Sequence, residues 1–256
     1  MPMTGLLVQL AALGLCLWLE SAVPLFMDRP QRVTHGIRNI GIGLLNGFVL
    51  TLGFSGLVAA SARWGELTAV GFLPRLNLAD RSELLVGFLA FDLWMYLWHR
   101  ANHALPLLWR FHRVHHSDPA VDSTSAYRFH LGEMVISTLL RLAVIPLLGI
   151  SLKNLVLYEL VLQPVILFHH SNIALPQRID RWIRLALVSP NMHRVHHSDI
   201  PAETNSNYAS IFSFWDRLGW TYRRRDVSSI LYGLREFRDA RWQSFRGLVF
   251  MPAAHP

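Results

Sequence analysis

The chain has 256 residues, of which 52% are hydrophobic and only 16% are charged. Soluble domains usually carry about 25% charged residues, so this composition predicts a membrane protein. The formal net charge is +7, and every basic residue except Lys153 is arginine. A basic excess can indicate nucleic acid or a membrane, and the long apolar runs favour the membrane, so we expect no nucleic-acid partner. The single cysteine, Cys16, excludes an internal disulfide framework and a cysteine-rich zinc or iron–sulfur site held by this chain alone.

Apolar runs in the first half predict membrane-spanning helices. Residues 6–27 are apolar apart from Glu20, and residues 39–62 carry no charge. Both runs reach the roughly 20 residues that a helix needs to cross the hydrocarbon. A third run, residues 84–98, carries Asp92 and is short for a span unless the polar segment after it continues the helix above the membrane.

The second half predicts a helical hairpin followed by a basic, more polar region. Residues 134–168 are too many for one untilted span, and the segment from Pro146 to Lys153 contains turn residues. Arginine recurs every third residue from Arg178 to Arg184, which predicts a basic amphipathic helix in the headgroup layer. The arginine-rich tail predicts that this end stays in the cytoplasm.

We therefore expect an all-α fold: a multi-pass bundle of about four transmembrane spans with a cytosolic helical cap that carries the histidine cluster. The predicted regions are residues 1–83 (N-terminal transmembrane helices), 84–222 (catalytic region) and 223–256 (basic tail). The abundance of arginine over lysine is typical of a GC-rich bacterial source.

Histidine is the anomaly of this sequence. The chain has 13 histidines, and most lie in tight groups between His99 and His197. The septet His-Arg-Val-His-His-Ser-Asp occurs at residues 112–118 and again at 193–199, which indicates two equivalent chemical roles. On helices, the spacing of His99 and His103, and that within each septet, places the imidazoles on one face.

These spacings give nine candidate metal ligands. Neutral imidazole binds iron, zinc, copper or nickel, and one metal seldom takes more than six ligands, so nine imidazoles predict two metal ions. A site made only of nitrogen fits redox iron better than structural zinc, which usually adds cysteine. His35 and His255 stand alone and are interpreted as ordinary histidines. The nine candidates are His99, His103, His112, His115, His116, His170, His193, His196 and His197.

Other polar residues are candidates for holding these imidazoles in place, because ligating histidines usually donate their second N–H to a carboxylate or carbonyl. Glu133, three residues after His130, is one such carboxylate. A helix cap or a surface salt bridge explains each carboxylate nearly as well. The remaining candidates for an outer contact or an extra ligand are Asp92, Asp118, Asp199, Asn172, His130 and His169.

Several motifs resemble one known family. The segments are HRANH (99–103), LWRFHRVHHSD (108–118), FHHSN (168–172), PNMHRVHHSD (190–199) and NYASIFSFWDRL (207–218). Together they resemble the fatty acid hydroxylase superfamily, the sterol desaturase group of membrane di-iron enzymes. The resemblance covers residues 84–222, and the departures, such as Leu131 where relatives often have proline, lie outside the doubled septet.

The resemblance implies a function for the whole chain. It makes the nine histidines named above ligands of two non-haem iron ions. It implies an oxidoreductase that uses O₂ to hydroxylate or desaturate a lipid or sterol-like substrate. Electrons would come from a separate reductase and a small redox carrier, because the chain has no dinucleotide-binding fingerprint. The expected location is a bacterial cytoplasmic membrane, with the site facing the cytoplasm.

Three alternatives remain open from the residues alone. A zinc-dependent membrane hydrolase would also use imidazoles, although no H-E-x-x-H motif is present. A metal transporter would place its ligands along a path at mid-membrane, and a bis-histidine haem protein would face histidine pairs across the bilayer. Tyr127, Tyr208 and Trp215 are candidates for lining a substrate channel, or for anchoring the chain at the membrane interface.

Overall fold

The computed structural model describes residues 3–29 and 31–254, which form helices joined by loops with no regular β-strand. The expectation of an all-α fold is therefore confirmed. Four helical segments are long and apolar enough to cross a membrane: Met3–Ala22, Arg32–Leu76, Leu131–Leu148 and Leu152–His170. In the second of these, only 11% of the most apolar window is buried, so most of its side chains face outward, as lipid contact requires.

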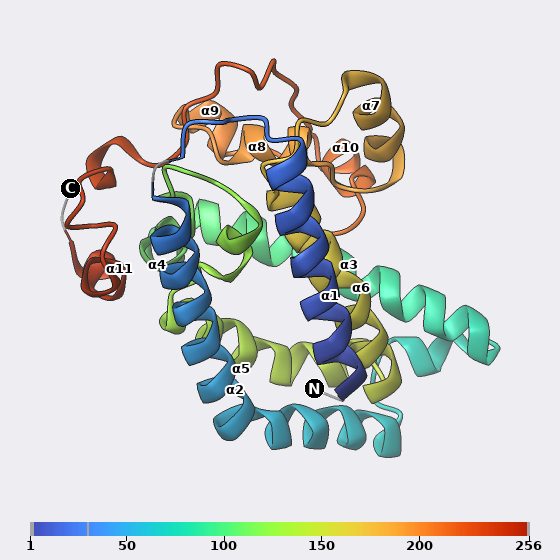
Figure 1. The fold of residues 1–256 in the computed structure, drawn as a ribbon. Helices are drawn as coiled ribbons and strands as arrows, with labels where there is room; N and C mark the ends of the chain where they lie inside the picture. Colours follow the sequence, from blue (N-terminus) through green and yellow to red (C-terminus); the bar gives the residue numbers. More distant parts are fainter. Residues whose placement is uncertain (1–2, 30, 255–256) are drawn as a thin grey trace.

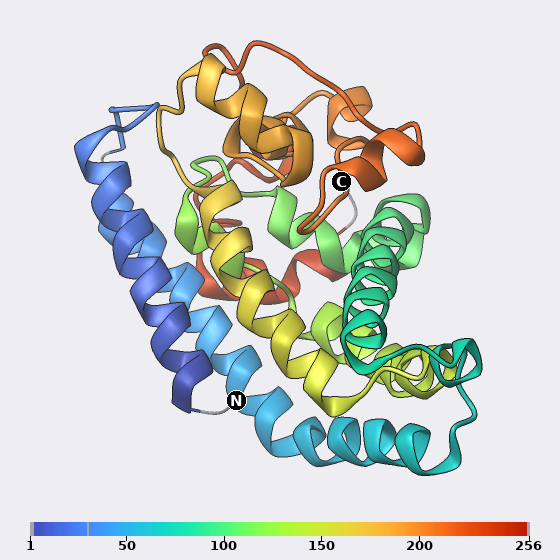
Figure 2. The same ribbon diagram turned by 90° about the vertical axis from the view of Figure 1, so that its right-hand side faces the viewer.

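The first two helices are α1 (Met3–Ala22) and α2 (Arg32–Thr68). Figure 1 shows α2 descending beside the bundle and then turning sideways beneath it. Figure 2 shows α1 and α6 as neighbouring helices that lead up to the cap. The cap lies above the bundle in both views and contains most of the C-terminal third of the chain, whereas residues 245–250 lie lower, beside α2 in Figure 1.

The third apolar run forms α3 (Asp80–Ala104) but is not among the four candidate spans. Charged residues at its start and after its apolar run lower its mean hydropathy. The helix continues past residue 98 through both histidines of the HRANH motif. The polar segment after the short apolar run is therefore helical and carries the helix beyond the apolar residues.

The predicted helical hairpin is present as α5 (Leu131–Leu148) and α6 (Leu152–His170). Helix α5 ends at Gly149, whose φ of 76° is the left-handed conformation that glycine adopts most easily. Helix α6 begins where the hydroxyl of Ser151 accepts a hydrogen bond from the Asn154 N–H. The predicted basic amphipathic helix is α7 (Gln177–Ala186), in which Trp182 is exposed and Arg184 is buried against Asp180.

Short helices in the cap hold the two septets. They are α4 (Pro106–His116) and α8 (Pro190–His196), and each starts with a proline, whose missing N–H is not needed in a first turn. The other short elements are η1 (Leu73–Leu76), η2 (Ser123–Tyr127), α9 (Pro201–Thr204), α10 (Phe214–Leu218), η3 (Arg235–Phe237), α11 (Phe245–Phe250) and η4 (Met251–Ala253).

The basic tail packs back onto the rest of the chain. Phe237, Leu248 and Met251 form a buried cluster with Ile42 and Val114. Arg113, from the first septet, donates hydrogen bonds to the carbonyls of Met251 and Ala254 at 2.5 and 2.7 Å. The tail therefore supports the helix that carries the first septet.

Candidate metal centre

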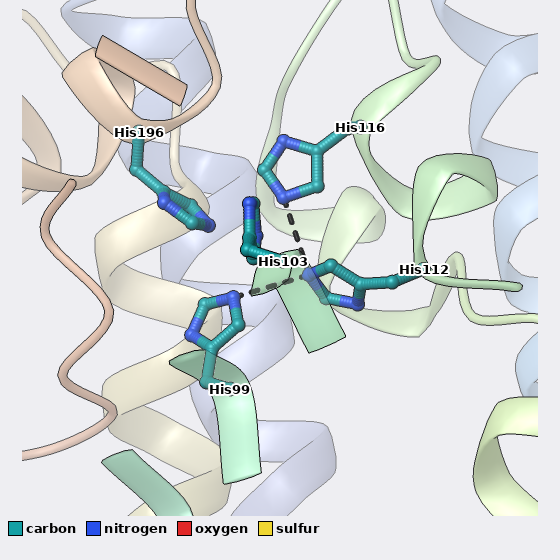
Figure 3. A group of neighbouring side chains, drawn as sticks. All are labelled: His99, His103, His112, His116 and His196. Atoms are coloured by element: carbon teal, nitrogen blue, oxygen red, sulfur yellow. Dashed lines mark hydrogen bonds between the residues drawn. The ribbon is translucent and has the colours of Figure 1, made fainter. Parts of the chain in front are cut away.

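The nine predicted histidines converge in two groups at the boundary between bundle and cap. The five-imidazole group contains His99, His103, His112, His116 and His196. The four-imidazole group contains His115, His170, His193 and His197. Within each group, one ligand atom of every residue lies within 4.8 Å of those of the others. Figure 3 shows the five rings of the first group pointing toward one another from three parts of the chain.

The Nε2 atoms of the five-imidazole group point inward. The Nε2 of His112 lies 3.1 Å from that of His99 and 3.2 Å from that of His116. The Nε2 atoms of His103 and His196 are buried and have no hydrogen-bond partner among the described residues. Several ring nitrogens thus share one small space, and few protons can be placed between them.

The outward-facing Nδ1 atoms of this group have fixed acceptors. The Nδ1–H of His99 donates to the Tyr208 carbonyl and that of His196 to the Ser206 carbonyl, both at 2.7 Å. The Nδ1–H of His112 donates to Glu133 at 2.9 Å. A carbonyl can only accept, so a neutral ring with its proton on Nδ1 must present a lone pair at Nε2.

The fourth such contact joins His103 to Asn205, whose side-chain oxygen lies 3.2 Å from Nδ1. Four of the five imidazoles therefore have their second nitrogen held, which is the arrangement that orients metal-ligating histidines. Lone pairs that converge in a buried space repel one another unless a cation lies between them. The residues of this group consequently fit a metal ion.

The four-imidazole group has the same inward geometry. The Nε2 of His170 lies 3.1 Å from that of His115 and 3.0 Å from that of His193, and the Nε2 of His197 lies 3.1 Å from that of His193. Here only His170 has a partner for its Nδ1, the Ile166 carbonyl at 2.8 Å. The Nδ1 atoms of the other three have none among the described residues.

Burial keeps His116 and His196 neutral. Burial, followed by the neighbouring histidines, holds the pKa of His116 and of His196 well below the ordinary histidine value. A ring with so low a pKa is uncharged at neutral pH, which is the form that binds a metal.

Of the residues predicted to hold the imidazoles in place, Glu133 is the one that hydrogen-bonds to a histidine of either group, His112. Three other contacts, to Asn205 and to the carbonyls of Ser206 and Tyr208, were not predicted, because no spacing in the sequence relates residues 205–208 to the histidines. A backbone carbonyl carries no residue-type signal, so the sequence could not have identified it.

The remaining predicted outer residues lie elsewhere. Asp92 is fully buried and accepts hydrogen bonds from Tyr158, Trp215 and the Phe212 N–H, so it joins α3 and α6 to the cap rather than orienting an imidazole. Asn172 makes two hydrogen bonds to the backbone of Phe26. These contacts hold the bundle to the cap.

The two septet aspartates also make other contacts than those expected. Asp118 lies 2.8 Å from the Nε2 of His35, a residue interpreted from the sequence as an isolated histidine. Asp199 pairs with Arg235 and Arg238 of the tail, each at 3.1 Å. The partner of Asp118 is 83 positions away in the sequence, which is why no local pattern pointed to it.

Neither extra histidine belongs to a group. His130 accepts a hydrogen bond from the Gly132 N–H at the start of α5, and its Nε2–H donates to the Val249 carbonyl. His169 stacks on His193 with ring centroids 4.0 Å apart, and neither of its ring nitrogens has a hydrogen-bond partner among the described residues. His255 lies outside the described residues.

One open cavity reaches the five-imidazole group. Its volume is about 470 Å³, and His103 and Trp109 line it together with polar residues of the cap. Of the three aromatic residues predicted to line a channel, Tyr208 lies beside His103 with ring centroids 5.0 Å apart. Trp215 packs in the cap and Tyr127 faces the bundle.

The model of the family described as fatty acid hydroxylase matches residues 84–221. The chain is 32% identical over 144 residues to the ornithine lipid hydroxylase OlsE of Rhizobium tropici, a match that covers 55% of this chain and 41% of that one. It is 29% identical to alkylglycerol monooxygenase of Danio rerio, covering 58% and 32%. It is 25% identical to cholesterol 25-hydroxylase of Rattus norvegicus, covering 56% and 47%.

Each of these matches spans less than half the length of the relative. No solved structure matches the chain. The matched segment contains all nine clustered histidines, from His99 to His197, and covers more than half of the sequence. This chain is an integral membrane protein that belongs to the fatty acid hydroxylase family.

Proposed function

We propose that this protein is a membrane-bound lipid hydroxylase that holds one iron ion in each imidazole group. The observation that carries the proposal is the convergence of nine imidazoles in two adjacent groups. Ligands made only of imidazole suit a redox-active iron, and two neighbouring ions suit the activation of O₂. The proposed ligands are His99, His103, His112, His116 and His196 for one ion, and His115, His170, His193 and His197 for the other.

When bound and reduced, such an iron pair supplies the means to insert one atom of O₂ into a C–H bond, while the other leaves as water with two electrons and two protons from a donor. The chain's own residues hold the site in place. Glu133, Asn205 and the two carbonyls at residues 206 and 208 orient four imidazoles so that their Nε2 atoms face the space between them. The apolar bundle excludes water and admits the hydrocarbon part of a substrate.

The relatives support a lipid substrate. Their names describe enzymes that act on an ornithine lipid, an alkylglycerol and cholesterol. All three names denote hydroxylases or monooxygenases, which favours hydroxylation over desaturation for this chain. The outward-facing apolar side chains of α2, such as Leu44, Phe48 and Leu52, place the protein where such lipids are dissolved.

Electrons come from a separate redox protein in this proposal. The cavity beside His103 and Trp109 opens on the cap, away from the lipid-facing helices, so it is a suitable place for a donor to approach. The arginine-rich tail packs against α4, which carries the first septet, and the positive-inside rule supports a cytoplasmic position for the cap. A bacterial cytoplasmic membrane fits this arrangement.

The test combines metal analysis with product analysis. We expect the purified protein to contain about two non-haem iron ions per chain. With a reductant and a membrane lipid extract, it should incorporate one atom of isotopically labelled O₂ into a lipid alcohol. A zinc-dependent hydrolase would instead show activity without O₂, and a transporter would show metal flux without any lipid product.

His116→Ala and its control, His130→Ala, sharpen the test. The first removes a proposed ligand and should abolish product and lower the iron content. The second removes a histidine that bonds only to the backbone of Gly132 and Val249, and it should leave both unchanged. Equal iron and equal product in the two variants would contradict the proposal.

A further inference from the structure

A line of hydrogen-bonded polar side chains lies inside the transmembrane bundle, away from the histidines. Glu159 of α6 pairs with Arg141 of α5 at 3.2 Å. Gln163, one turn along α6, donates to Glu159 at 3.3 Å and accepts from Gln9 of α1 at 3.2 Å. We call these four residues the polar ladder.

The polar ladder lies at a depth of the bundle where charged and amide side chains are energetically unfavourable. Arg141 and Glu159 lie near the middle of two candidate spans, where charged side chains are rare because their burial in hydrocarbon is unfavourable. Charged and amide groups at such a depth usually face the interior of a bundle and mark a pathway for a ligand or ion. The function assigned to the histidines does not require this ladder.

The polar ladder also keeps unused hydrogen-bonding capacity. The Nε of Arg141 is buried and has no partner among the described residues. All four side chains remain partly exposed, so each has surface left for a ligand. In addition, Pro164 has no N–H, which frees the carbonyl of Leu160, the residue four positions earlier in α6.

An apolar cavity of about 130 Å³ lies beside the polar ladder. Glu159 is its one charged lining residue, and the others come from α1, α2 and α6: Gly5, Val58, Leu152, Leu155, Val156 and Leu160. The exposed wall of this cavity is entirely apolar, so it gives room for hydrocarbon beside the aliphatic part of the Glu159 side chain.

The polar ladder leads toward the four-imidazole group. Glu159, Gln163 and His170 are spaced four and seven residues apart, so they lie along one face of α6. Gln9 also donates to the hydroxyl of Tyr127 at 3.1 Å, and Phe129, two residues later, stacks on His115 with ring centroids 4.3 Å apart. The distance along α6 from Glu159 to His170 is roughly 16 Å, at 1.5 Å per residue.

We propose that the polar ladder binds a hydroxyl group at one end of the lipid substrate while the carbon to be oxidised lies at the other end, beside the four-imidazole group. This proposal rests on the proposed function and names the class of substrate: a neutral amphiphile whose polar group is roughly 16 Å from the reacting carbon. A hydroxyl fits because it can donate to Glu159 and accept from Gln163 or Arg141. The ion pair is neutral overall, so it favours an uncharged group over a carboxylate or an ammonium.

The experiment measures binding, so it does not depend on turnover. The probes are two matched pairs in detergent micelles, cholestanol against cholestane and octadecanol against octadecane, and the members of each pair differ only in the hydroxyl. We expect the wild-type protein to bind each alcohol about tenfold more tightly than its hydrocarbon, the effect of one or two hydrogen bonds in an apolar site.

The deciding variant replaces both charges together, Arg141→Leu with Glu159→Leu, so that no unpaired charge remains in the bundle. It should bind the alcohol and the hydrocarbon equally, with the hydrocarbon affinity and the iron content unchanged. The control removes an ion pair of the cap, Arg225→Leu with Glu203→Leu, and should keep the preference. If the double variant does not fold, Gln163→Leu should reduce the preference on its own.

A wild-type protein without the hydroxyl preference, or a double variant that keeps it, would overturn the proposal. A purely structural role for the polar ladder would lower stability and leave the preference intact. Failure of the proposed function has a separate signature, since a protein without iron or O₂-dependent product can still discriminate between the probes.

Discussion

The two copies of the septet are identical in sequence, but they divide their histidines between the two imidazole groups in opposite ways. In the first copy, His112 and His116 belong to the five-imidazole group and His115 to the four-imidazole group. In the second copy, His193 and His197 belong to the four-imidazole group and His196 to the five-imidazole group. In each septet, the first and third histidines thus belong to one group and the second histidine belongs to the other.

This exchange gives each group three imidazoles from the repeats, two from one copy and one from the other. The groups differ in what completes them. Helix α3 adds two imidazoles, His99 and His103, one turn apart, whereas α6 adds only His170 because the residue one turn earlier is Ile166. The repeat therefore sets up two equal sites, and the surrounding helices make them unequal.

The hydrogen bonds around the groups increase the inequality. Four of the five imidazoles have an acceptor for Nδ1 in one group, against one of four in the other, counting the described residues. Outer contacts of this kind raise metal affinity. We infer that the five-imidazole group holds its ion more tightly, while the four-imidazole group has more room for O₂ and substrate.

The largest effect is expected from replacing the second histidine of either septet, one at a time. His115→Ala leaves three imidazoles in its group and His196→Ala leaves four in the other. Both variants should lose about 100-fold or more of the activity, since ligand loss exceeds the effect of outer contacts. Iron per chain should fall toward one in His115→Ala and less in His196→Ala. Equal iron loss in the two would contradict the inequality of the groups.

The two septet aspartates should differ in their contribution to stability. Asp118 is fully buried with His35 at 2.8 Å, so Asp118→Ala leaves a buried partner uncompensated and should cost about 3–5 kcal/mol. Asp199 pairs with Arg235, whose side chain is 73% exposed, and with Arg238, so Asp199→Ala should cost about 1 kcal/mol or less. Thermal unfolding in detergent measures both, and similar melting temperatures would show that the copies have equivalent surroundings.

The outer contact of His112 should change the affinity of one group only. Glu133→Leu removes the acceptor of its Nδ1–H and should weaken iron binding by about 10–100-fold in the five-imidazole group. The four-imidazole group should keep its affinity. Asp239→Ala, at an exposed side chain of the tail, is the control and should change neither. Spectroscopic titration with ferrous iron distinguishes the two sites.

The sequence predicted much of this centre, because the helical spacing of His99 with His103 and the doubled septet follow from local geometry. The hairpin was also predictable from Pro146 and Gly149. The distribution of the histidines between groups was not, since it depends on how α4 and α8 pack against each other. Asp92 and His35 were interpreted incompletely for the same reason: their partners, Trp215 and Asp118, lie 123 and 83 positions away.

The smallest expected effect is a stepwise loss of iron to a chelator. The four-imidazole group has one ligand fewer and fewer outer contacts, so its ion should leave at a chelator concentration about tenfold lower than the other. Iron content measured across a chelator series should therefore show a plateau near one ion per chain. In Glu133→Leu the two steps should lie closer together, because the five-imidazole group loses one of its four outer contacts. A single step in the wild-type protein would mean that the extra imidazole and the hydrogen bonds of His99, His103 and His196 add no affinity, and the two copies of the septet would then be equal in function as well as in sequence.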